Sequence, residues 1–331
     1  MEILQYDYMV RALLASVMVG VTAPMVGIYL VQRRITLIGD GIGHVALTGV
    51  AIGVLTGTSP IWASLVCSVA AAVAIELIRW GGRASGDVAL AVIFYGGIAG
   101  GVVLISQSPN GSSTSLNAYL FGSIATTSQS DLAVFAVLAA VVVLVCVGFA
   151  RRLFAVSNDE EYARASGMNV LGMNLLLAVL TATTVVVSMR IVGLLLISAL
   201  MIVPNAAAQQ VTRSFASTLG VAVLIGLFVS VGGTVASYYA DAPSGGTIVL
   251  LAIAVFVLAA AFAGVLDRVH ARRHHPALEH HHEHGPGCGH PAVPHGDHLD
   301  YLHDGHLHAP HGGGYDDHDT LVEVEPQVGD R

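Results

Sequence analysis

The sequence contains no lysine and few charged residues of any kind. All 14 basic residues are arginine, and charged residues make up 11% of the 331 positions, against about 25% in an ordinary soluble domain. Without lysine the chain has no Walker A motif, because that phosphate-binding loop requires one. The chain also has too few polar side chains to cover a water-facing surface. We therefore predict an all-α protein that crosses a membrane several times.

Cysteine is scarce as well. Cys67 and Cys146 lie in apolar runs, and Cys288 lies near the C-terminus. Three separated cysteines predict neither a disulfide framework nor a CxxC metal site. Residues 1–7 are acidic rather than basic and do not resemble a cleaved signal peptide. The first apolar segment is therefore expected to remain as a membrane helix.

Charge and histidine divide the chain into two parts. Residues 1–266 hold ten arginines and ten acids, whereas residues 267–331 hold four arginines and twelve acids and carry the whole net charge of −8. Fifteen of the 16 histidines also lie in the second part, which leaves His44 as the only one in the first. The sequence predicts a transmembrane domain over 1–266 and a His/Asp-rich tail over 267–331.

Nine apolar runs approach the roughly 20 residues that a membrane-spanning helix needs. They lie at 9–31, 36–57, 61–79, 88–106, 131–150, 169–189, 190–210, 215–237 and 246–266. Arg190 and Pro204 interrupt the seventh run, so a count of eight, with one segment broken, remains open.

Most arginines of the body fall on one side of this membrane arrangement. With the N-terminus outside, nine spans place every arginine except Arg11 and Arg190 in the inner loops or the tail. Because cytoplasmic loops are enriched in arginine and lysine, this orientation is favoured and places the tail in the cytoplasm. Eight spans would keep the tail there only if the N-terminus were also inside.

Asp40 and His44 form an ionisable pair at the start of the second predicted span, whereas Glu76 and Arg79, near the inner end of the third, are expected to pair with each other. Asp40 and His44 are four residues apart, so a helix places them on one face. Ionisable groups inside a membrane are costly and usually functional. Carboxylate and imidazole suit Zn²⁺, Mn²⁺ or Fe²⁺, and two copies of the chain would supply four ligands. A mutual hydrogen bond with a structural role is the alternative.

Five motifs in order resemble the permease subunits of bacterial zinc and manganese ABC importers. They are Arg33-Arg34 with Gly39-Asp40 and His44 to Ala51, Ala118 to Gly122, Ala163 to Gly167, Arg190 to Pro204, and Asp241 to Gly246. Together they cover nearly all of 9–266. Asn205 departs from the pattern, where alanine is expected, and the His-rich tail is a larger departure.

The resemblance implies a homodimer in the bacterial cytoplasmic membrane, with separate ATPase subunits and an extracytoplasmic metal-binding protein. It implies that Asp40 and His44 line the metal path. It also implies that a short cytoplasmic helix, with Asp159, Glu160, Ala163 and Gly167, couples the chain to the ATPase. The chain itself is then a transporter subunit rather than an enzyme. Apart from these partners and membrane lipid, no nucleic acid and no cofactor other than the transported ion is expected.

The tail combines many histidines with glycine, proline and aspartate and has few apolar residues. Such a composition predicts disorder. Clustered imidazoles predict weak metal binding, at His280, His281, His282, His284, Cys288, His306 and His308. Buffering, sensing or delivering metal, and no role at all, remain open.

Three functions are therefore weighed. The first is an ABC importer permease for a divalent metal, most of all zinc, with manganese or iron as alternatives. The second is a secondary, ATP-independent zinc carrier, but such a carrier is expected to place several histidines in its spans, whereas this body has only His44. The third is a membrane-anchored metal sensor or store, for which nine spans are far more than an anchor needs.

Overall fold

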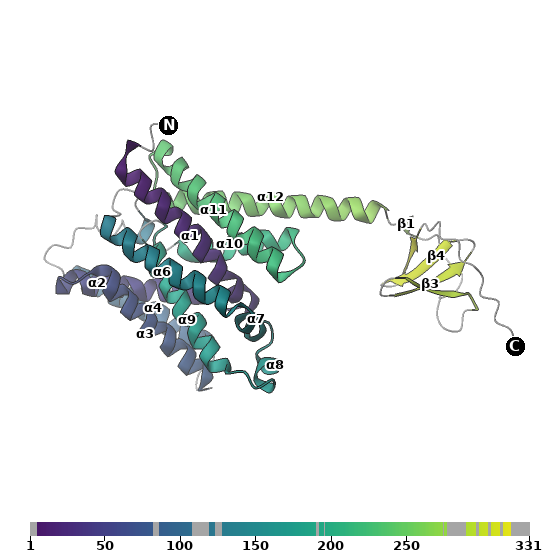
Figure 1. Cartoon of the computed structure of the whole chain (residues 1–331), viewed down its shortest axis with the longest axis horizontal. Coiled ribbons are helices and arrows are strands. Elements are labelled where there is room, and N and C mark those ends of the chain that lie inside the picture. The colour runs from purple at the N-terminus through teal and green to yellow at the C-terminus, as the bar shows by residue number, and fades with distance from the viewer. Residues whose placement is uncertain are drawn as a thin grey trace. The chain divides into compact units, whose positions relative to one another are not determined.

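The computed structural model describes residues 5–81, 86–107, 119–122, 128–189, 192–194, 196–273, 275–276, 289–295, 298–303, 306–311 and 314–318. The chain divides into two compact units, Met1–Ala260 and Ala261–Arg331. The first unit is a bundle of helices, and the second contains a small sheet (Figure 1).

Eight helices in the described residues are long and apolar enough to cross a membrane. They are α1 (Asp7–Gln32), α2 (Ile38–Thr56), α3 (Pro60–Trp80), α4 (Gly86–Ser106), α6 (Gln129–Gly148), α9 (Val170–Ser188), α11 (Phe215–Ala240) and α12 (Ser244–Arg273). They correspond to eight of the nine apolar runs of the sequence, and this confirms the predicted polytopic all-α body.

The seventh apolar run, 190–210, is broken. Its helical part, α10 (Ile197–Val211), has 15 residues, which at 1.5 Å per residue is too short to cross the hydrocarbon core. The preceding described residues 192–194 are not helical, and Gly193 has a φ of 86°. A Cβ at position 193 would lie 2.3 Å from the carbonyl oxygen of Leu120, so only glycine fits this turn.

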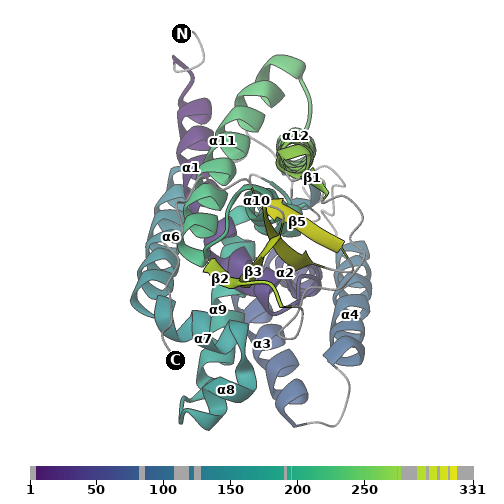
Figure 2. The same ribbon diagram turned by 90° about the vertical axis from the view of Figure 1, so that its right-hand side faces the viewer.

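The helices of the body are layered around α1 and α2. α1 packs along α11 and α10, while α2 is held between α3 and α4 and also contacts α9 (Figures 1 and 2). Glycines bring several of these backbones close together: a Cβ at Gly49 would lie 2.5 Å from Ser64 Cα, and one at Gly53 would lie 2.7 Å from Pro60 Cα. Close approach at small residues is the usual source of helix association in lipid.

Two short helices follow α6 at the end of the bundle opposite the N-terminus (Figure 2). They are α7 (Ala150–Asn158) and α8 (Glu160–Ala165). Asp159 caps α8 by accepting a hydrogen bond from the Tyr162 N–H at 2.8 Å, whereas the preceding Ser157 and Asn158 belong to α7. Aspartate is one of the favoured residues at this position.

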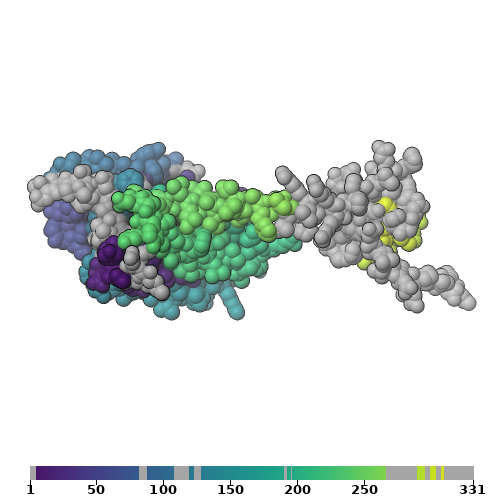
Figure 3. Space-filling model, turned by 90° about the horizontal axis from the view of Figure 1, so that it is seen from above, coloured from purple at the N-terminus to yellow at the C-terminus, as the bar shows by residue number. Residues whose placement is uncertain are grey.

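The outer surface of the helical body is apolar. Large side chains stand exposed on several spans, among them Val66 of α3, Tyr95 of α4, Leu144 of α6 and Leu258 of α12. Figure 3 shows one face of this body in space-filling form, with α12 in green forming part of the surface. An exposed apolar belt on long apolar helices is what lipid contact requires.

The described part of the tail contains strands, where the sequence predicts disorder. β1 (His275–Pro276), β2 (Ala292–His295), β3 (His298–His303), β4 (His306–His311) and β5 (Gly314–His318) form one antiparallel sheet in the order β1-β5-β4-β3-β2. Tyr301 of β3 faces His308 of β4 across the ladder, and Leu302 faces Leu307. Tyr301, Leu307 and His308 are buried, so the few apolar residues of the tail are concentrated in one place.

Candidate metal site and coupling helix

Asp40 and His44 lie one turn apart in the first half of α2. Both side chains are partly buried, and neither makes a hydrogen bond or an ion pair with any residue in the described ranges. The alternative in which the two residues bond to each other is therefore not what the structure shows. Neither residue is among the described residues with a buried, unpartnered polar atom, so the carboxylate and the imidazole are accessible to a ligand.

On one side of this pair, α4 packs closely against α2. The His44 ring meets the Phe94 ring edge to face, with 4.4 Å between centroids. One turn further along α2, the Thr48 hydroxyl donates a hydrogen bond to the Gly97 carbonyl oxygen at 2.6 Å. A Cβ at Gly97 would lie 2.7 Å from the Val45 nitrogen and 2.8 Å from the His44 carbonyl carbon. The glycines of α4 thus let its backbone approach α2 and orient His44.

The opposite side of the pair faces the broken segment. A Cβ at Gly43 would lie 3.1 Å from the Leu194 carbonyl oxygen, and one at Gly39 would lie 3.2 Å from the Ser198 hydroxyl. Ser198 is buried, and its Oγ has no hydrogen-bond partner among the described residues. Oxygens at interrupted helices commonly line ion paths in transporters. Sequence reasoning did not single out these two residues; the interruption of the run at 190–210 was the only signal of them.

Asp40 and His44 stand as a pair of metal-ligating side chains in the part of the chain that the structure describes. The described residues hold no group of three or more histidine, cysteine, aspartate or glutamate side chains that could bind a metal. A tetrahedral Zn²⁺ site needs four ligands, or three with a water. The Asp40/His44 pair therefore becomes a complete metal site only with groups from elsewhere.

The second charged region lies near α8, the helix for which the sequence predicts a coupling role, and we call it the Arg33 cluster. Its members are Arg33, Glu76, Arg79, Glu160 and Arg164. Arg33 Nη2 lies 3.2 Å from Glu160 Oε2, and Arg33 Nη1 lies 3.7 Å from Glu76 Oε1. Glu76 is also paired with Arg79 at 2.7 Å, as the sequence predicts from their spacing.

The charges of the Arg33 cluster are strongly buried at its centre. The side chains of Arg33 and Glu76 are 5% and 4% exposed. Burial lowers the pKa of Arg33, and the carboxylates of Glu76 and Glu160 oppose that shift. A guanidinium keeps its proton well above neutral pH, so Arg33 is a permanent positive charge between two acids from different helices.

The predicted coupling residues are all placed by α8. Asp159 caps it, Glu160 points its carboxylate into the Arg33 cluster, and Gly167 follows it with a φ of 78°. Ala163 is completely buried, against Val156 and Val170. Tyr162, in contrast, is 68% exposed. One face of α8 is thus anchored to the body and the other is open.

The predicted tail ligands are only partly described. His280, His281, His282, His284 and Cys288 lie outside the described residues. His306 and His308 both belong to β4, and His308 is buried opposite Tyr301 on β3 and Asp317 on β5. Metal binding by the tail stays a prediction.

Comparison with known proteins settles the family. Residues 5–263 match the ABC 3 transport family. The chain belongs to this family. It is accordingly a permease subunit of a metal ABC transporter and a multi-pass protein of the bacterial cell membrane.

Relatives of this ABC 3 family member carry the names of different metals. The chain is 32% identical over 270 residues to the manganese transport system membrane protein MntC of Halalkalibacterium halodurans, which covers 81% of this chain and 92% of the relative. It is 30% identical over 254 residues to the high-affinity zinc uptake system membrane protein ZnuB of Haemophilus influenzae, covering 76% and 97%.

A solved structure agrees with this assignment. PsaBC from Streptococcus pneumoniae, determined in complex with a Fab, superposes with a TM-score of 0.71 at 30% identity and covers 78% of this chain and 92% of that chain. The matched portion of the chain is the helical body, and the His-rich tail lies beyond the family match, which ends at residue 263.

Proposed function

We propose that this permease imports a divalent metal ion, zinc before manganese or iron, and that Asp40 and His44 bind the ion within the membrane. The observation that carries the proposal is an unpaired carboxylate and imidazole, one turn apart, on the span that is packed between α3 and α4. The family makes the chain part of an ABC transporter. ATP hydrolysis then belongs to a partner chain, because this sequence has no lysine for a phosphate-binding loop.

A homodimer would complete the site. Each chain offers one carboxylate and one imidazole, so two chains offer four ligands, which is the number that zinc prefers. The oxygens of Leu194 and Ser198 next to α2 are further candidates when the ion moves. Rearrangement of the two chains would then change the coordination number and release the ion, as alternating access requires.

Zinc is preferred over manganese on the chemistry of the donors. Two imidazoles per site suit zinc better than manganese, which favours carboxylate and water. The zinc uptake protein ZnuB and the manganese transport protein MntC are similar to this chain at nearly equal identity, so the choice rests on the ligands. Fifteen histidines in the tail fit the same preference.

The test compares metal uptake by the full chain and by Asp40→Ala and His44→Ala. Each variant is expressed with its ATPase and binding protein in cells that depend on added zinc, and the amount of protein in the membrane is measured alongside. We expect zinc-dependent growth and ⁶⁵Zn uptake to be lost in both variants at unchanged membrane content. Asp7→Asn, an exposed acid in the first turn of α1, is the control and should transport normally.

Other outcomes would contradict the proposal. Wild-type uptake by both variants would exclude Asp40 and His44 from the path. Uptake in vesicles without ATP would favour the secondary carrier, and stronger competition by Mn²⁺ than by excess Zn²⁺ would favour a manganese importer. Deleting residues 271–331 should leave transport intact. If the full chain transported no metal and the deletion abolished the response of the cells to metal, the protein would be better described as a sensor.

The tail is proposed to bind metal next to the exit of the path. Full-length protein should retain more Zn²⁺ after dialysis than protein ending at residue 270, as measured by elemental analysis. Neutral imidazole is the ligand, so the excess should disappear when the pH falls below about 6, where histidine is protonated. Equal metal contents at pH 7.5 would exclude this role.

A further inference from the structure

The Arg33 cluster forms a closed ring of contacts between α8 and the membrane helices. Arg164 of α8 pairs with Glu160 at 3.2 Å and lies over the Trp80 ring of α3 at 4.8 Å from its centroid. Glu160 pairs with Arg33, and Arg33 approaches Glu76 of α3. α8 is thus linked to α3 in two ways: directly by Arg164 on Trp80, and through Arg33, which lies between Glu160 and Glu76. Arg33 is the only residue of the cluster that belongs to neither α3 nor α8.

Arg33 connects the cluster to α2 through the chain itself. Arg33 ends α1, and residues 34–37 link it to α2, whose first turn carries Asp40. Arg34 in this link has a φ of 57°, a left-handed conformation that side-chain-bearing residues seldom adopt. A short and turned link of this kind transmits a displacement of Arg33 to the start of α2, since it has little slack.

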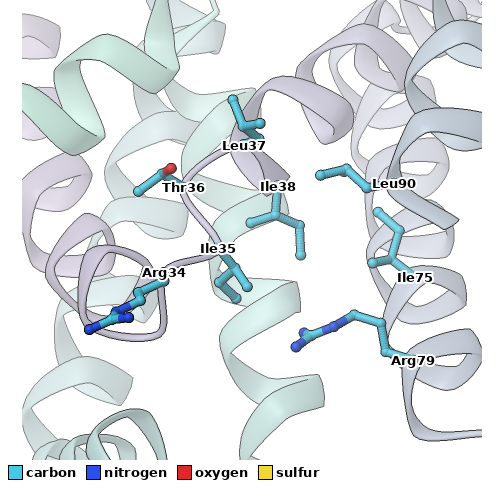
Figure 4. A pocket seen from close by; sticks show the side chains of 8 residues that line it. All are labelled: Arg34, Ile35, Thr36, Leu37, Ile38, Ile75, Arg79 and Leu90. Carbon is cyan, nitrogen blue, oxygen red and sulfur yellow. The ribbon is translucent and has the colours of Figure 1, made fainter. Parts of the chain in front are cut away.

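Space beside the link and beside the Arg33 cluster would allow such a displacement. A pocket of about 240 Å³ adjoins it and is lined by Ile35, Leu37, Ile75, Arg79, Leu90 and neighbours (Figure 4). In Figure 4 the Arg79 side chain reaches from α3 toward the link. A second, polar cavity of about 570 Å³ is lined by Glu76, Arg79, Trp80, Glu160 and Arg164. The ring is thus bordered by open volume rather than by a close-packed core.

α8 is joined to the body by an apolar contact and an ionic contact. The apolar contact, at Ala163, joins it to α7 and α9, and α9 also packs against α2. The ionic contact, at Glu160, reaches Arg33 over a sequence separation of 127 residues. Arg33 is nearly fully buried and contacts two acids at once, Glu160 through Nη2 at 3.2 Å and Glu76 through Nη1 at 3.7 Å, so it stays paired with Glu160 when the longer contact with Glu76 opens.

We propose that Arg33 is the positioning residue through which movement of α8 reaches α2 and the Asp40/His44 pair. The inference rests on the proposed function, in which an ATPase acts on α8. When α8 moves, the Glu160 carboxylate draws the Arg33 guanidinium with it and away from Glu76. The start of α2 follows, and the metal ligands are repositioned relative to α4.

The experiment measures zinc transported per ATP hydrolysed by the full transporter in proteoliposomes. Arg33→Gln and Glu160→Gln each remove one charge of the bridge. We expect both variants to bind the ATPase and hydrolyse ATP, while zinc transport per ATP falls by roughly tenfold, the size of a typical coupling between two sites. Zn²⁺ binding to the detergent-solubilised chain should not change, because neither residue touches the ion.

Two controls separate transmission from a general structural role. Arg34→Gln removes the neighbouring arginine, which is exposed and makes no ion pair with any described residue, and should keep the wild-type ratio. The double variant Arg33→Gln/Glu160→Gln should lose no more than the more affected single variant, because the two residues act as one unit. If Arg33→Gln does not accumulate in the membrane, Glu160→Gln decides alone, since its side chain is 35% exposed.

Several results would overturn the inference. A wild-type ratio in both single variants would show that the bridge transmits nothing. Loss of ATPase binding would show that the Arg33–Glu160 bridge belongs to the docking surface for the ATPase. If the double variant lost zinc transport per ATP by the product of the two single losses, Arg33 and Glu160 would act independently. If the wild-type chain itself moved no zinc with ATP, the proposed function would fail first, and that result is distinguishable from a failure of the bridge alone.

Discussion

The metal pair on α2 and the Arg33 cluster near α8 use charge in opposite ways. Asp40 and His44 form no hydrogen bond or ion pair in the described part of the chain, only an electrostatic interaction with each other, and they are held by the shape of α4 and the broken segment. In the Arg33 cluster every charge has a partner of opposite sign, and its centre is buried. Burial alone therefore does not mark a ligand site in this protein. The distinguishing property is whether the buried charge is already paired within the chain.

Removing a charge should lower the free energy of unfolding most at the buried centre of the Arg33 cluster. Glu76→Gln leaves Arg33 and Arg79 without their shared carboxylate, and the free energy of unfolding should fall by about 3 kcal/mol, the usual result of breaking a buried pair. Reversible unfolding in mixed detergent micelles measures it. Glu161→Gln, an exposed acid on α8, should change it by less than about 0.5 kcal/mol; equal effects would remove the distinction.

The next largest loss in the free energy of unfolding is expected from disturbing the close packing of α2 against α4. Gly97→Ala places a methyl group 2.7 Å from the Val45 nitrogen, so the helices must separate, at a cost of about 2 kcal/mol in unfolding free energy. Zinc uptake should fall with it, because His44 is displaced. The neighbouring Gly96 has open space at its Cβ position, and Gly96→Ala should leave both stability and uptake intact. Normal uptake by Gly97→Ala would show that close packing does not position His44.

The exposed end of the Arg33 cluster should matter less than its centre. The Arg164 side chain is 58% exposed, so its pairing with Glu160 is screened by water. Arg164→Gln should lower the free energy of unfolding by less than about 1 kcal/mol. The loss should shrink in high salt. A loss as large as that of Glu76→Gln would mean that the ring, rather than its buried centre, stabilises the fold.

The smallest effect on stability is expected at the metal pair itself. Asp40→Asn keeps the size of the side chain and removes a charge that forms no ion pair with a described residue and interacts only electrostatically with His44, so the free energy of unfolding should change by less than about 0.5 kcal/mol. Zinc uptake should nevertheless be lost. Unfolding and uptake measured on the same preparation separate the two effects. A strongly destabilised Asp40→Asn would indicate a structural role and undo the comparison.

Much of the body could be predicted from the sequence. Apolar runs of about 20 residues can form only helices in a membrane, because every backbone polar group must be satisfied within the segment, and eight of these helices are present. Glu76 and Arg79 are close in sequence, so their pairing was predictable too. The bridge from Arg33 to Glu160 was not, because it joins residues 127 positions apart, and no local pattern encodes such a contact.

The tail and Asn205 are two further features that could not be predicted from the local sequence. Tyr301 of β3 and Leu307 of β4 are buried in the sheet, although composition alone predicts disorder. Asn205 departs from the expected family pattern, and the structure gives it a reason: its amide donates hydrogen bonds to the carbonyl oxygens of Pro24 and Met201 at 3.0 and 2.7 Å. Both results depend on which segments meet, and helix or strand propensity carries no such information.

By itself the sequence determined that the chain is a membrane protein, that it has no Walker A loop, and that Asp40 and His44 share a helix face. These conclusions follow from composition, from the missing lysine and from helical spacing, all of which are local. Tertiary structure alone decided that Asp40 and His44 are unpaired, that Leu194 and Ser198 lie beside them, and that Arg33 joins α8 to α3. Close approach of distant backbones at glycines and the pairing of buried charges decide such contacts, and both depend on the whole fold.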